Sequence, residues 1–131
     1  MNGQFPLEYK VQERPITIIS RLKSQVLVTG EYLVLHCNAS LSSKSTVLME
    51  WRHNGQYIGR DKNENKYNVS MFIDGNYISS ELSISNVSFI DAGDYECLAL
   101  DGVRRDGSAV FIATSNNASV KVLGVFYTLA C

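Results

Sequence analysis

The chain of 131 residues has no long hydrophobic run and almost no net charge. Its most apolar stretch, the C-terminal "VLGVFYTLAC", is too short to span a bilayer. Twelve basic and thirteen acidic side chains leave a net charge of −1, which argues against a nucleic-acid or anionic-membrane partner. The opening residues lack the apolar core of a signal peptide, so we expect a mature segment or an excised domain.

Histidine and cysteine are also scarce, and their spacing excludes most catalytic and metal-binding patterns. There is no Cys-x-x-Cys pair, and neither His36 nor His53 accompanies a Ser or Cys in a nucleophile context. The acidic pair Asp91 and Asp94 belongs to a turn. We therefore expect a protein that is not an enzyme and has no metal, cofactor or small-molecule substrate.

What the chain does contain is apolar residues that recur with a period of two, separated by turn signals such as Asn54-Gly55. This pattern predicts eight or nine short strands and no helix longer than a turn, as in an all-β sandwich or barrel. The β-rich runs from which these strands should form cover residues 16–20, 25–30, 32–39, 47–53, 56–59, 66–73, 77–87, 94–103, 108–113 and 118–123.

Alternation along these strands separates an inward face from an outward one. One set of inward residues ends at Cys37, another contains Trp51, and a third contains Tyr95 and Cys97. Two of the three cysteines could pair and leave one over. The two that point inward from facing sheets are close enough to bridge where the sheets approach.

These residues carry a resemblance to a known family. The chain resembles immunoglobulin superfamily domains, nearer the intermediate set than the antigen-receptor variable set, across residues 16–123, with a lead-in at 1–15 and a tail at 124–131. The signature consists of Cys37, Trp51, Asp91, Gly93, Tyr95 and Cys97. The resemblance implies a β-sandwich of two antiparallel sheets with Greek-key connections.

The resemblance also assigns structural roles to the signature. It implies a disulfide between Cys37 and Cys97, with Trp51 packed on it, and a Tyr95 hydroxyl that bonds back to the backbone. Asp91 should meet a basic side chain, for which the candidates are Lys66 and Arg60. These residues define the domain and not its partner.

Four Asn-X-Ser acceptor sequences favour an extracellular or cell-surface location reached through the secretory pathway. The acceptors are Asn38, Asn68, Asn86 and Asn117. The first three should lie on or beside the sheet opposite Trp51 and Cys97, which leaves the other sheet mostly free of glycan.

The outward face of segments 47–53 and 94–103 is therefore the expected binding surface, because it should expose three leucines unless the last strand or the short strand at 56–59 partly covers them. The resemblance implies cell adhesion or recognition, with a protein partner that is a second copy, in a weak homodimer, or another cell-surface protein. The candidate contact residues are Leu48, Arg52, Tyr57, Leu98, Leu100, Arg104 and Arg105, the last two at the tip of a protruding hairpin.

Two other functions remain open. One is a structural spacer in a filament-type or multidomain protein, in which the cysteines would stay reduced. The other is a secreted decoy or growth-factor-binding module. Cys131 would be a free thiol, or would pair outside the domain.

Overall fold

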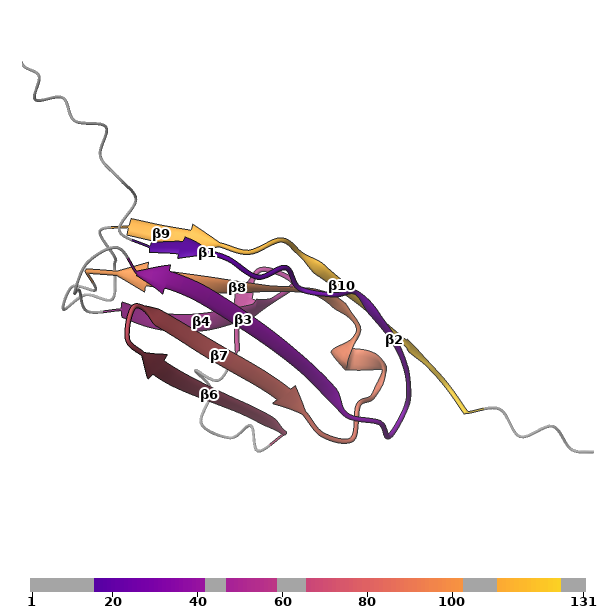
Figure 1. Ribbon diagram of the computed structural model, residues 1–131. Coiled ribbons are helices and arrows are strands. Elements are labelled where there is room, and N and C mark those ends of the chain that lie inside the picture. Colours follow the sequence, from indigo (N-terminus) through magenta and orange to yellow (C-terminus); the bar gives the residue numbers. More distant parts are fainter. Residues whose placement is uncertain (1–15, 42–46, 59–65, 103–110, 126–131) are drawn as a thin grey trace, which may run out of the picture.

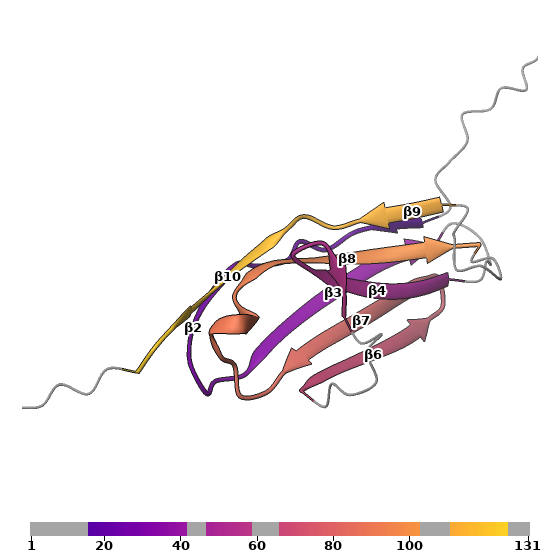
Figure 2. The ribbon, with the colours of Figure 1, turned by 180° about the vertical axis from the view of Figure 1, so that it is seen from behind.

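The computed structural model describes residues 16–41, 47–58, 66–102 and 111–125 and shows two packed β-sheets (Figures 1 and 2). The four-stranded sheet has the order β1 (Ile16–Ile18), β3 (Leu33–Leu41), β7 (Tyr77–Ile84) and β6 (Tyr67–Asp74). The six-stranded sheet has the order β2 (Gln25–Val28), β10 (Ala118–Leu123), β8 (Gly93–Asp101), β4 (Val47–His53) and β5 (Gln56–Tyr57), with β9 (Phe111–Thr114) also paired to β8. The predicted all-β sandwich is confirmed.

Within the described ranges the only helical element is the single 3₁₀ turn η1 (Phe89–Asp91). That part of the chain contains no helix long and apolar enough to cross a membrane. Strand pairing is antiparallel except between β2 and β10, which run parallel. In Figure 1 the four-stranded sheet lies in front, and Figure 2 shows the other sheet from its outer side.

The described chain has ten strands rather than eight or nine, because its first and last strands each break in two. The breaks lie side by side and are joined by Asn116, whose side-chain oxygen accepts the Leu22 N–H at 2.8 Å and whose amide donates to the Leu22 carbonyl at 3.0 Å. The first broken strand thereby contributes β1 to one sheet and β2 to the other, while both parts of the last strand pair with β8, β10 only through Ala118–Val120 (Figure 2).

The space between the sheets is filled by the inward residues that alternation predicted. Cys37 on β3 and Cys97 on β8 form a disulfide with a Cα–Cα distance of 6.4 Å, as the resemblance implied. Trp51 on β4 is buried in the same cluster, and its indole N–H donates to the Ser80 hydroxyl at 2.9 Å. Ser80 in turn donates to the Ser70 carbonyl, so the polar side-chain atoms of Trp51 and Ser80 are both hydrogen-bonded.

The Asp-x-Gly-x-Tyr segment forms a corner between η1 and β8. The buried Tyr95 hydroxyl donates to the Asp91 carbonyl at 2.6 Å, which confirms the expected tyrosine corner. The Asp91 carboxylate is fully buried, accepts the Ser88 N–H at 2.8 Å and pairs with Lys66 at 2.6 Å. Of the two basic candidates, Lys66 therefore meets Asp91, while Arg60 lies outside the described residues.

Gly93 is needed at this corner for two reasons. Its φ of +133° is a conformation that side chains rarely adopt, and an added Cβ would lie 2.4 Å from the Asn54 side-chain oxygen. That oxygen accepts the Asp94 N–H at 2.9 Å. Asn54 itself starts the Asn-Gly turn between β4 and β5, where both turn residues have positive φ, as such two-residue hairpins require.

We predict that Gly93→Ala destabilises the domain by about 2–4 kcal/mol, because it combines backbone strain with a clash. In an Asn54→Gly background the clash is gone, so the same substitution should cost about 1 kcal/mol less. Urea unfolding of the parent, the two single variants and the double variant measures the cost of Gly93→Ala in each background. Equal costs in the two backgrounds would show that Asn54 plays no part in the requirement for glycine.

Tyr95 should make the free energy of unfolding depend on pH above about pH 10, the ordinary pKa of a tyrosine phenol. Burial first, and then the neighbouring Asp91 and Tyr67, raise the pKa of the Tyr95 phenol in the folded state. The unfolded chain ionises first, so this contribution is fully present below about pH 10 and is lost as the pH rises further, by up to about 1.4 kcal/mol per pH unit.

Tyr95→Phe should cost about 1–2 kcal/mol at pH 7, because the Asp91 carbonyl loses its donor. The variant also lacks the alkaline loss, so its unfolding free energy should converge with that of the parent above pH 10. Denaturant unfolding between pH 7 and 11 checks this. Curves that stay parallel over this range would contradict the raised pKa.

Candidate recognition surface

The outer face of β5, β4, β8 and β9 is a regular array of nine side chains, fixed by strand register. We call it the recognition face. Cross-strand pairing and alternation put three residues in each of three rows across the strands. The rows are Tyr57, Arg52 and Glu96; then Glu50, Leu98 and Thr114; then Leu48, Leu100 and Ile112.

The first row is polar and partly ordered by its own contacts. Arg52 forms a salt bridge with Glu96, and their side chains are 28% and 20% exposed. The Arg52 guanidinium also lies 5.7 Å from the centre of the Tyr57 ring. A guanidinium held between a carboxylate and an aromatic ring offers a fixed polar contact at little further cost in side-chain entropy.

The third row is apolar and open to solvent at both ends. Leu48 on β4 is 37% exposed and Ile112 on β9 is 50% exposed, with the buried Leu100 between them. Together with the half-open Tyr57, these side chains give the face an apolar end and a charged end. Such a mixture is typical of protein contact surfaces.

The prediction that Leu98 and Leu100 are exposed was wrong. They are 1% and 4% exposed, although neither belongs to the core cluster between the sheets. Alternation identified the face on which they lie but not how far it is covered. β8 lies between β4 and β9. Side chains of both neighbouring strands therefore cover each leucine and reduce its exposure to water.

Ile112 and Thr114 were missed by the sequence analysis, although a signal for them exists. The exposed Ile112 comes directly before the buried Ala113, so alternation in "FIAT" gives its face once β9 is paired with β8. Of the expected contact residues, five belong to the recognition face: Leu48, Arg52, Tyr57, and the buried Leu98 and Leu100. Arg104 and Arg105 lie outside the described residues.

The four glycosylation acceptors are all exposed, and none of them occupies the recognition face. Asn38 on β3 and Asn68 on β6 belong to the four-stranded sheet, as expected. Asn86 lies in the turn after β7, and Asn117 directly precedes β10. Glycans at Asn38 and Asn68 would be rooted on the opposite sheet, whereas Asn117 is an exception, because it lies between β9 and β10 of the six-stranded sheet.

The chemistry available on this face is non-covalent. It presents a guanidinium, carboxylates, a phenol ring and aliphatic groups, with no serine or cysteine nucleophile among the nine residues. In the part of the chain that the structure describes, no group of three His, Cys, Asp or Glu side chains is arranged to hold a metal ion. The arrangement suits contact with another macromolecule.

Comparisons with known proteins agree with the fold and the signature. Two curated relatives are each 30% identical: contactin of Drosophila melanogaster, over 68% of this chain, and the membrane-bound isoform of pro-neuregulin-1 of Xenopus laevis, over 67%. The matched regions cover only 6% and 13% of those longer proteins.

Solved structures show the same sandwich at lower identity. A chimeric titin Z1Z2 aligns with a TM-score of 0.63 at 22% identity, over 86% of this chain and 97% of that one. The first immunoglobulin domain of Dpr1, solved bound to that of DIP-eta, aligns with a TM-score of 0.60 at 12% identity, over 82% and 95%. A family model described as an immunoglobulin domain matches residues 15–100, and the chain belongs to that family.

Proposed function

We propose that this domain mediates extracellular adhesion or recognition by binding another protein through the recognition face. The observation that carries the proposal is the array itself, in which exposed Leu48 and Ile112 lie one strand on either side of buried Leu100, and the ordered Arg52 and Tyr57 lie at the other end of the same face. An exposed apolar end joined to a pre-ordered guanidinium and ring has the composition of a binding hot spot.

The oxidised core supports an extracellular location. Disulfides persist in oxidising compartments and are rare in the cytosol, and Cys37 and Cys97 are bonded here. The four acceptor asparagines are all exposed, as a glycoprotein requires. Both observations favour a cell-surface or secreted parent protein over an intracellular one.

The structural relatives support a protein partner of similar shape. The first domain of Dpr1 was solved bound to an immunoglobulin domain of another protein, so a sandwich of this kind can bind a second sandwich. The likeness to titin concerns the fold alone. A spacer role would leave the exposed apolar row of the recognition face without a purpose.

Self-recognition is the simplest form of the proposal and is tested by sedimentation equilibrium of the glycosylated domain, in a Cys131→Ser background that removes the extra thiol. We expect a weak reversible dimer that Ile112→Glu weakens about ten-fold or more, since a charge is then buried against an apolar row. Val26→Glu, at an apolar position on β2 that is 62% exposed against 50% for Ile112, is the matched control and should leave the dimer intact.

A chain that is monomeric at every concentration would contradict self-recognition. The partner would then be another cell-surface protein, and tetramers of the domain should stain cells that display it. Staining should be lost with Ile112→Glu and after protease treatment of the cells, and kept with Val26→Glu. Staining that survives Ile112→Glu would place the binding site elsewhere and overturn the proposal.

A further inference from the structure

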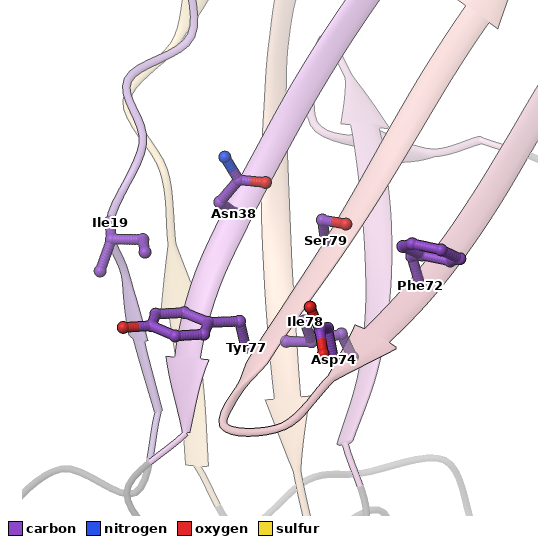
Figure 3. A pocket seen from close by; sticks show the side chains of 7 residues that line it. All are labelled: Ile19, Asn38, Phe72, Asp74, Tyr77, Ile78 and Ser79. Carbon is purple, nitrogen blue, oxygen red and sulfur yellow. The ribbon is translucent and has the colours of Figure 1, made fainter.

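A shallow pocket of about 340 Å³ opens on the outer face of the four-stranded sheet, on the opposite side of the sandwich from the recognition face (Figure 3). Its walls come from β6, β7 and the segment after β1. The side chains that matter are Ile19, Asn38, Phe72, Asp74, Tyr77 and Ser79.

The pocket is apolar on three sides of Asn38. Ile19, Phe72 and Tyr77 are 54%, 73% and 58% exposed, an unusual amount of open apolar surface for one sheet face. Figure 3 shows the Tyr77 ring extended across β3, below Asn38 and toward Ile19. Strand register explains the grouping, because Asn38 lies opposite Ser79 and Ser79 lies opposite Phe72.

Asn38 is also a glycosylation acceptor, in the sequence Asn38-Ala39-Ser40. Ala39 is buried and points into the core, so Asn38 and Ser40 share the outer face. The Asn38 side chain is exposed and lines the pocket. A sugar bonded to its amide nitrogen would therefore start inside the pocket.

We propose that Asn38 carries an N-linked glycan whose first N-acetylglucosamine packs in this pocket against the ring of Tyr77. The donor is a lipid-linked oligosaccharyl diphosphate of the secretory pathway. A bond forms between the Asn38 amide nitrogen and C1 of the sugar, the bond from C1 to the phosphate oxygen breaks, the amide loses one proton, and the lipid diphosphate leaves.

The chemistry of the pocket fits this sugar. One face of the pyranose ring presents C–H groups. Their hydrogens carry a partial positive charge, which is attracted to the negative face of an aromatic ring. The Asp74 carboxylate and the Ser79 hydroxyl, both in the pocket lining, can accept hydrogen bonds from sugar hydroxyl and amide groups. Neighbouring strands are about 4.8 Å apart, so Ile19 and Ser79 are one strand from Asn38 and Phe72 is two.

A glycan packed in this pocket would cover the apolar side chains of Ile19, Phe72 and Tyr77, which otherwise face water. It would lie on the sheet face opposite the recognition face. The inference shares the secretory route with the proposed function but does not depend on the recognition face or on any partner. Its two consequences are a glycan at Asn38 and a stabilising contact between that glycan and Tyr77.

A double-mutant cycle on the full chain from a secretory host tests the contact. Ser40→Ala removes the acceptor sequence but keeps Asn38, and Tyr77→Ala removes the exposed ring. Because Ser40 lies opposite Tyr77, the same four proteins from a host that adds no glycan give the direct coupling of the two side chains, which is subtracted. We expect Tyr77→Ala to lower the folding equilibrium constant roughly three- to ten-fold more in the glycosylated protein than in Ser40→Ala. Tyr77→Phe keeps the ring and should keep the coupling.

Removal of a different glycan is the control. Ser119→Ala removes the acceptor sequence at Asn117, and Tyr77→Ala should cost the same with and without it. Glycopeptide mass spectrometry establishes which acceptors are occupied. An unoccupied Asn38, or a Tyr77→Ala cost that is equal with and without the Asn38 glycan, would overturn the inference. Glycans found only at the other acceptors would do so while leaving the extracellular location in place.

Discussion

The disulfide between Cys37 and Cys97 is the constraint on which the rest of the structure depends, because it joins β3 in one sheet to β8 in the other. The bond closes a loop that contains β4, β5, β6 and β7, with a sequence separation of 60 residues. In the chain-entropy model such a loop stabilises the folded state by about 4 kcal/mol. Trp51 and Tyr95 pack in the same core cluster, so the bond lies at the centre of the buried residues.

Fixing these two strands also fixes which side chains face outward. With Cys97 inward, β8 must present Glu96, Leu98 and Leu100 on the recognition face, and β4 must present Leu48 and Arg52 beside them. With Cys37 pointing inward, β3 must present Asn38 on the outer face of the four-stranded sheet. The recognition face and the pocket at Asn38 therefore both follow from the inward placement of the two cysteines.

Much of the framework could be predicted from the sequence, because it rests on local signals. Period-two alternation predicted the inward residues, the Asn-Gly pair predicted the β4–β5 turn, and the family resemblance implied the corner at Tyr95. Surface exposure could not be predicted in the same way. Leu98 is outward yet buried, and the pocket at Asn38 exists only because register brings Phe72 and Tyr77 from two other strands beside it.

The account requires a domain that is built for an oxidising environment. The most direct test is the unfolding free energy of the Cys131→Ser protein with the Cys37–Cys97 bond intact and with it reduced. We predict that reduction lowers the unfolding free energy by about 4 kcal/mol, in line with the loop that the bond closes. Equal stability in the two states would contradict the account and favour an intracellular spacer that keeps both thiols reduced.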